Sequence, residues 1–552
     1  MANRSLDYIP FNSLQKDPKG ELQHIVEGTF LASSGFILRL NPDSPLWYRT
    51  APESSSQPAQ MCITARAEAP YNAGRKEDDA YFDIDFTLFA GEDLRAAYII
   101  MANHLQGGAG GIQRPPREPE EHMYAYPIWE ITAGRSREFA EAADLTTANV
   151  KKFADHLKKE GQRHNVLLLD AWWALPTDYM VMNDDEKLHD FVHLNELLNP
   201  ASGKGYDYRL HLAVTPYVPV GSPFAKMNPA FLLQDGLRSG STFVIREGPQ
   251  MNHSLVDFSN PKAARWFLDK LSYFQKTYKM ASFVFEPVTV TDDNVKYADR
   301  LVRDVPALYS TTYAQIASQL QGGSMAIVKE ARDNQGLPLF VNMAPRVSDW
   351  TDPRGIKSLI PTALALSLAG YSFIVPDLVG GRLPGPSRSL IPDAELYTRW
   401  AQATALMPAM QFATPPWYYN ETISDAVEAA ITLHTTTFKE LMKRLVTERV
   451  KGDGSPIMRP MWWADPEDPK LYEAGVVDTQ FLFGEKGTGK QLHLVAPILV
   501  QGATERMVYL PNGKWFQQQG AENAPLAREL QGGREYRVSA DLNNLLFFKL
   551  QI

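Results

Sequence analysis

The chain has 552 residues, several times the length of a typical domain of about 100 to 150 residues, so we expect two to four domains. Its content of 44% apolar and 22% charged residues excludes a collagen-like, low-complexity or largely disordered protein. The net charge of −9 excludes a global positive field for nucleic acid or anionic membrane, and the single Cys62 excludes an intramolecular disulfide and a cysteine-based zinc site.

Residues 1–120 alternate short apolar runs with clusters of Ser, Pro, Gly and Asn, a pattern typical of an antiparallel β-sandwich. The runs are FILRL, MCITARA, AYFDIDFTLF and AAYIIM, and they predict an all-β N-terminal domain. The Gly/Pro-rich stretch at 106–121 lacks the strand-to-helix context of a phosphate-binding loop. We interpret it as a domain boundary or a long loop.

Residues 121–420 alternate candidate strands with helical periodicity, which predicts a (β/α)8 TIM barrel. The candidate strands are YAYPIWEIT, NVLLLDAWW, YRLHLAVTPYV, ASFVFEPV, LPLFVNMA, YSFIVPDL and LMPAMQFA, and the helical segments include TTANVKKFADHLKKEG and NPKAARWFLDKLSYFQKTY. Residues 421–455 are predicted to form a helical connection. Residues 456–552 return to short strands and are predicted to form a C-terminal β-sandwich region.

Barrel enzymes place their chemistry at the C-terminal ends of the strands, so the residues that end each strand are the candidates. The second strand ends in LLLDAWW, which sets Asp170 beside Trp172 and Trp173. Aromatic rings beside a carboxylate favour sugar binding, although a core Trp and a helix-capping Asp are the alternative. The fourth strand delivers Glu286, either a nucleophile or base of glycoside chemistry or an ordinary solvated loop acid.

Polar residues also end the later strands. The expected fifth strand is followed by a loop with Asn342, Arg346, Trp350 and Asp352, which is either part of a pocket or a common Pro/Asp/Gly turn. The seventh strand ends with Asp377, expected to be exposed, and the eighth region carries Gln411 and Trp417. Polar groups at most strand ends favour a ligand pocket over scattered surface charge.

Several long strings of the sequence resemble glycoside hydrolase family 31, in particular its myogenesis-regulating glycosidase branch. They are SLVDFSNPKAARWF (254–267), ASFVFEP (281–287), GIKSLIPTALALSLAGYSFIVPDLVGG (355–381), ELYTRWAQATALMPAMQFATPPW (395–417), PIMRPMWWADPEDP (456–469) and VYLPNGKWF (508–516). The resemblance implies an N-terminal β-sandwich, a catalytic barrel and C-terminal β-domains. It also implies retaining hydrolysis of a terminal α-linked hexose, with no metal and no organic cofactor.

This sequence departs from the family pattern at the catalytic positions. The branch's Phe-Asp-Ala-Gly-Glu string, whose aspartate is the nucleophile, is replaced by a string that places Glu286 at the nucleophile's position. Aligning Trp350 and Gly355 with the family's Trp-Gly-x-Asp-x-Gly pattern puts Pro353 where the acid belongs, with Asp352 adjacent. The family's substrate-binding arginine falls on Asn342, and only Asp170 remains of a paired Asp-Asp, whereas Asp377 and Trp417 keep their family identities.

Three hypotheses follow. We favour a glycosidase-like protein whose pocket binds a terminal α-linked hexose, or a protein partner, with weak or no hydrolysis. The alternative is an active retaining α-glucosidase or α-galactosidase with Glu286 as nucleophile and Asp352 as acid/base, and a storage or structural role is the third. We expect a carbohydrate ligand, no cofactor, no nucleic acid and no membrane, and homo-oligomerisation stays open. The compartment is also open: the secretory pathway if a signal was trimmed, otherwise the cytoplasm.

Overall fold

The computed structural model describes the chain except for residues 1–5, 11–26, 41–45, 52–59, 66–83, 108–116, 133–145, 170–191, 197, 200–206, 246–251, 289–294, 298–307, 322, 352, 384–390, 453, 485–490, 519–527 and 552. Four predicted site residues, Asp170, Trp172, Trp173 and Asp352, lie outside the described residues, as does most of the Gly/Pro-rich stretch. Their predicted roles stay predictions.

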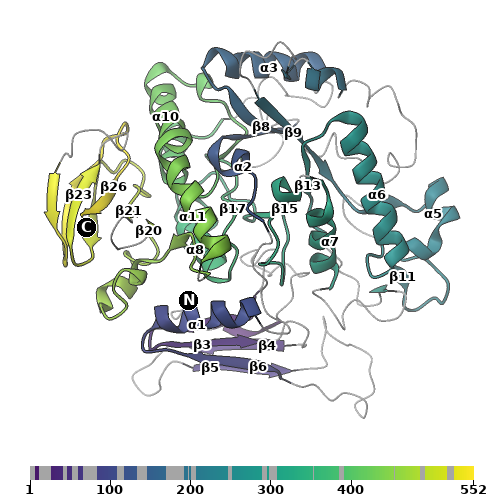
Figure 1. The fold of residues 1–552 in the computed structure, drawn as a ribbon, viewed down its shortest axis with the longest axis horizontal. Coiled ribbons are helices and arrows are strands. Elements are labelled where there is room, and N and C mark those ends of the chain that lie inside the picture. Colours follow the sequence, from purple (N-terminus) through teal and green to yellow (C-terminus); the bar gives the residue numbers. More distant parts are fainter. Residues whose placement is uncertain are drawn as a thin grey trace.

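A closed barrel of eight parallel strands forms the centre of the molecule and confirms the predicted fold class (Figure 1). Its neighbours run in the order β17-β16-β15-β13-β9-β8-β7-β18. Past the end of β17, a parallel bridge between Leu378 and Gln411 and a 2.7 Å hydrogen bond from Val379 N to Gln411 O join this edge of the sheet to β18. The strands are β7 (Ile128–Ile131), β8 (His164–Leu169), β9 (Asp207–Val214), β13 (Ser282–Phe285), β15 (Ile327–Val328), β16 (Phe340–Asn342), β17 (Ile374–Val375) and β18 (Gln411–Phe412).

Seven of these strands match the sequence prediction, and the two-residue strand β15 was missed. Because β15 is the fifth strand of the barrel, Asn342 closes the sixth strand, β16, and the expected numbering of that strand was wrong. Two residues are too few to show the alternation of apolar and polar residues that marks a strand in a sequence. Only its pairing with β13 and β16 defines β15 as a strand.

Helices surround the barrel (Figure 1). Both helical segments expected from periodicity are present, as α3 (Thr147–Lys159) and α6 (Pro261–Tyr278). Each begins at a side-chain cap: Thr146 Oγ1 accepts from Asn149 N, and Asn260 Oδ1 accepts from Lys262 N. The other helices of this region are α2 (Glu121–Ala125), α5 (Pro223–Met227), α7 (Leu308–Gln319), α8 (Leu359–Leu368), α9 (Ala394–Thr404), α10 (Glu421–Leu433) and α11 (Lys439–Lys451).

The segment predicted as a helical connection begins with α10, which follows β18 after a short 3-10 turn at Pro416–Tyr418. A π-helical turn, His434–Phe438, joins α10 to α11. From α11, Lys439 Nζ reaches the hydroxyl of Tyr126 at 2.8 Å, and Thr447 donates to Glu118. These helices therefore pack against the start of the barrel domain, whose sequence lies more than 300 residues earlier. The exact domain boundaries stay predictions.

The N-terminal region forms two three-stranded antiparallel sheets. They are β1 (Leu6–Pro10), β4 (Leu46–Ala51) and β5 (Gln60–Ala65), and β2 (Thr29–Ala32), β3 (Phe36–Leu40) and β6 (Phe86–Ala90). The expectation of an all-β region was wrong at AAYIIM, which lies in helix α1 (Leu94–Gly107). Asp93 caps this helix through Ala96 N, and buried residues at 94, 97, 98 and 101 follow the helical period.

The C-terminal region is rich in strands, as expected. A six-stranded sheet contains β19 (Met458–Arg459), β20 (Phe481–Gly484), β21 (Leu492–Val495), β26 (Phe547–Gln551), β23 (Lys514–Gln518) and β24 (Arg528–Gln531), and a second ladder joins β22 (Glu505–Leu510) to β25 (Arg534–Ser539). Its core is shared with the N-terminal region, since Tyr98 of α1 packs edge-on against Trp463 at 5.4 Å. No helix in the described ranges is long and apolar enough to cross a membrane.

Candidate active site

Three polar side chains form a row at the C-terminal ends of adjacent barrel strands. The register pairs Phe285 with Val328 and Val328 with Val341. Continued by one position, it sets Glu286, Lys329 and Asn342 side by side, pointing to the same face of the sheet. The backbone bonds Glu286 N to Val214 O at 3.0 Å and Lys329 N to Phe285 O at 3.1 Å extend the ladder to this row. Strand register therefore brings together a carboxylate, an ammonium and an amide.

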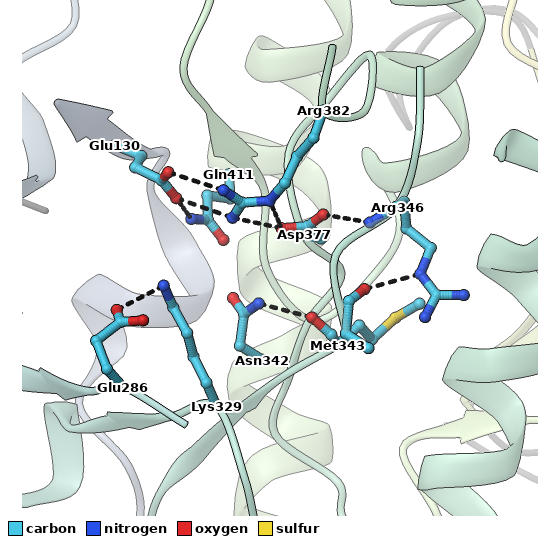
Figure 2. Close-up of polar contacts among 10 residues, drawn as sticks. Glu130, Glu286, Lys329, Asn342, Met343, Arg346, Asp377, Arg382 and Gln411 are labelled. Carbon is cyan, nitrogen blue, oxygen red and sulfur yellow. Dashed lines mark hydrogen bonds and ion pairs between the residues drawn. The ribbon is translucent and has the colours of Figure 1, made fainter. Parts of the chain in front are cut away.

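Glu286 and Lys329 form an ion pair, with 2.6 Å between Lys329 Nζ and Glu286 Oε1 (Figure 2). Their side chains are 18% and 13% exposed, so water screens the pair only partly. The backbone after Glu286 is also held, since Val288 N donates to Glu330 Oε2 at 3.3 Å and Glu330 Oε1 accepts from Ser310. The Glu286 carboxylate is thus tied to a cation that follows the neighbouring strand.

A second polar group surrounds Arg382, which follows β17 in the chain. Its guanidinium lies 2.9 Å from Asp377 Oδ1 and 3.3 Å from both oxygens of Glu130, and Gln411 Nε2 donates to Glu130 at 2.8 Å (Figure 2). Asp377 Oδ2 accepts from the backbone N–H of Arg346 at 2.7 Å. The four side chains come from β7, β18 and the loop after β17, and they form one network in which Glu130, Asp377 and Gln411 are buried and Arg382 is partly exposed.

The expectation that Asp377 is exposed was wrong, because its residue is fully buried. A buried carboxylate needs a compensating charge and hydrogen bonds, and Arg382 and the Arg346 N–H supply both. Asp377 also adopts a left-handed backbone conformation, with φ of 63°. A non-glycine residue in that region is uncommon, and the network holds it there.

Arg346 and Trp350 lie beside the strand ends, but their side chains pack into the interior of the protein. The Arg346 guanidinium donates to Ala344 O at 2.8 Å and to the hydroxyls of Ser358 and Thr362, so it points away from Asp377 (Figure 2). Burial lowers its pKa, and Asp377 partly offsets this effect. Trp350 is buried in the barrel core. Asn342 is also buried, and its amide donates to Met343 O at 2.7 Å.

Trp417 is not brought together with these side chains. Its ring stacks on His156 of α3 at 4.2 Å and lies against Phe153 and Trp129. Trp129 is adjacent in sequence to Glu130 and so faces the opposite side of β7, toward the helices. Trp417 therefore occupies the layer between strand and helix, and a part in sugar binding stays a prediction.

Sequence reasoning missed Glu130, Lys329 and Arg382. The signal for Lys329 was weak, because its strand has two residues. Glu130 interrupts the apolar run of β7 and could have been noticed as a charged residue in a buried strand. Arg382 and its partner Glu130 are 252 residues apart in the sequence. They come together only because the barrel closes, so the sequence alone does not identify the pair.

A closed barrel with carboxylates at its strand ends, flanked by β-domains, is a glycosidase-like architecture. The model described as "Glycosyl hydrolases family 31 TIM-barrel domain" matches residues 123–438, and "Glycosyl hydrolase family 31 C-terminal domain" matches residues 454–549. The chain belongs to glycosyl hydrolase family 31.

Two relatives lie in the branch expected from the sequence, which confirms that resemblance. Myogenesis-regulating glycosidase of Mus musculus is 28% identical over 504 residues, covering 90% of this chain and 65% of that protein. SITS-binding protein of Tetronarce californica is 28% identical over 558 residues, covering 97% of this chain and 71% of that protein. A Flavobacterium johnsoniae GH31 dextranase complexed with glucose shares the fold, with a TM-score of 0.74, 18% identity, and coverage of 98% of this chain and 62% of its own. The chain thus spans less than two thirds of the mouse protein and of the dextranase.

Proposed function

We propose that this family 31 protein binds a terminal α-linked hexose at its barrel mouth and hydrolyses it weakly or not at all. The ion pair between Glu286 and Lys329 carries the proposal. A retaining nucleophile must stabilise a sugar that becomes positively charged in the transition state. An ammonium group paired with that carboxylate repels the positive charge that develops on the sugar. It therefore raises the energy of the transition state.

The size of this effect can be worked out. If the Lys329 ammonium lies about 5 Å from the anomeric carbon, a full unit charge there is disfavoured by about 3 kcal/mol at an effective dielectric constant of about 20. That energy corresponds to a rate about two hundredfold lower. The second loss is the general acid: Pro353 occupies the family's acid position, and proline has no proton to donate. General acid catalysis contributes a factor of about 10² to 10⁴ in rate. The two losses together therefore favour a protein with weak or no hydrolysis.

Sugar binding needs hydrogen-bonding groups rather than a reactive carboxylate. Gln411 Oε1 is buried and has no hydrogen-bond partner among the described residues, so it is an acceptor that these residues leave unused. The row Glu286–Lys329–Asn342 offers further donors and acceptors at the same end of the barrel. The glucose complex of the F. johnsoniae dextranase supports a sugar as the ligand class.

The test combines turnover and binding. The wild-type chain and Glu286→Gln are incubated with a panel of α-glucosides and α-galactosides, and hydrolysis and calorimetric binding are measured for each. Glu505→Gln, which alters an exposed carboxylate of the C-terminal region, is the matched control. We expect binding in all three proteins and at most trace turnover, which Glu286→Gln leaves unchanged.

Turnover that Glu286→Gln abolishes and Glu505→Gln retains would establish the active α-glycosidase instead. That alternative is favoured by one observation: Glu286 lies in the row of polar side chains at the C-terminal ends of the strands, where barrel enzymes carry their chemistry. The absence of both turnover and binding would leave the structural or storage role.

A further inference from the structure

Two histidines and a carboxylate gather at the N-terminal end of the barrel. His164 is the first residue of β8 and Asp207 the first of β9, and the register pairs them directly. His122 lies on α2, which precedes β7 in the chain. One ligand atom from each of the three lies within 4.8 Å of the others. Because β8 is six residues long, at about 3.3 Å per residue, this cluster is well separated from the strand ends that carry Glu286.

We propose that His122, His164 and Asp207 bind one divalent transition-metal ion of the zinc class. Tetrahedral zinc with bonds of about 2.0 to 2.2 Å sets its ligand atoms about 3.3 to 3.5 Å apart. His122 Nε2 and Asp207 Oδ2 are already 3.3 Å apart. The other separations are within 4.8 Å, and the side chains of His122 and Asp207, 14% and 36% exposed, can rotate to close them while the His164 ring stays stacked on Tyr126. This metal site is independent of the proposed sugar site and its chemistry.

The ligand set selects the kind of metal. Imidazole nitrogens suit zinc, copper and nickel, whereas calcium and magnesium require oxygen ligands, of which this cluster has only one carboxylate. Burial lowers the pKa of both His122 and His164, and Asp207 partly offsets the shift in each. The buried Nδ1 of His164 makes no hydrogen bond among the described residues.

Neighbouring side chains hold the His164 ring in place. Tyr126 stacks on His164 with 4.7 Å between ring centroids and an interplanar angle of 22°. The Tyr126 hydroxyl in turn accepts from Lys439 Nζ at 2.8 Å. Lys439 also pairs with Glu121 at 3.0 Å, so its charge is balanced locally. A ring held by packing loses less freedom when it binds a metal.

Arg209 is the competitor for this site. Its guanidinium lies 2.8 Å from the same Oδ2 of Asp207, and its charge also lowers the pKa values of both histidines. The Arg209 side chain is 43% exposed and can move into solvent when a dication takes its place. Removing the arginine should therefore strengthen metal binding. If the Arg209–Asp207 ion pair had only a structural role, its loss would not have this effect.

The test uses the whole chain, dialysed against a chelator and titrated with Zn²⁺ by calorimetry, with Co²⁺ as the spectroscopic probe and Mg²⁺ as the negative control. We expect one Zn²⁺ per chain, visible d–d bands with Co²⁺ and no Mg²⁺ binding. Loss of a ligand should exceed the 10- to 100-fold loss that is typical of an outer-shell partner, so His164→Gln should weaken binding by at least about a hundredfold. The control His156→Gln, which alters a partly exposed histidine of α3, should bind as wild type.

Arg209→Met gives the second arm, with affinity expected to rise about tenfold because a neighbouring positive charge is lost. This variant keeps all three ligands, so it decides the question even if His164→Gln does not fold. The proposal is overturned if the wild type binds no Zn²⁺, if His164→Gln binds as tightly as His156→Gln, or if Arg209→Met leaves the affinity unchanged.

Discussion

Replacing Arg382 tests whether its buried network holds the barrel mouth together. Arg382 is 16% exposed, whereas the side chains of Glu130 and Asp377 are fully buried. Arg382→Met would leave both carboxylates buried without their cation. Breaking a buried ion pair from one side costs about 3 to 5 kcal/mol. Gln411 and the Arg346 N–H still contact the two carboxylates, so we expect the lower end, about 3 kcal/mol.

The assay is urea denaturation, with Arg265→Met as the matched control. Arg265 pairs with Asp269 one helical turn away, but it is 71% exposed, and such pairs contribute about 0.5 kcal/mol or less. The reasoning would be refuted if both substitutions lowered the free energy of unfolding equally. A further check is Arg382→Met combined with Glu130→Gln, which should recover part of the lost stability because one buried charge is removed.

Two further predictions concern stability. Burial lowers the pKa of His211 to about 3 and those of His434 and His493 to about 4, so each is neutral in the folded protein at pH 5. Unfolded histidines titrate near 6.5, so stability present above that pH is lost as the pH falls, by about 2 kcal/mol per histidine between pH 7 and 5; an unchanged urea midpoint would contradict this. Gly381 has φ of +73°, and an added Cβ would lie 2.7 Å from backbone atoms, whereas Gly502 has φ of +71° and open space. Gly381→Ala should therefore lower the melting temperature clearly more than Gly502→Ala, where only the left-handed penalty of about 1 to 2 kcal/mol applies, and equal shifts would refute the steric argument.

The sequence was most informative where structure depends on nearby residues. Helices α3 and α6 were predictable because their caps, Thr146 and Asn260, and their apolar periodicity are local signals. The same periodicity was present in α1 but was overlooked in favour of a strand, since its apolar residues also form a continuous run. The (β/α)8 barrel could be predicted because strand and helix patterns alternate over a long region of the sequence.

The site was harder to predict because it depends on contacts between distant strands. Glu286 could be identified from the sequence because it follows a clear strand. Its partner Lys329 follows β15, which is defined as a strand only by its pairing with the neighbouring strands. Asp377 was expected at the surface because a charged residue after an apolar run usually is solvated. The Arg382 side chain that permits its burial comes from a loop five residues later, and no periodic pattern marks that contact.

The central claim is that the Glu286 carboxylate no longer acts as a nucleophile, and a covalent trap tests it most directly. Activated fluorinated α-glucosyl and α-galactosyl fluorides transfer their sugar to a competent nucleophile, and mass spectrometry of the digested chain then locates the adduct. We predict no adduct on the peptide containing Glu286 in the wild-type protein, while the parent hexosides still bind by calorimetry. A glycosylated Glu286 would contradict the account and establish a working retaining glycosidase.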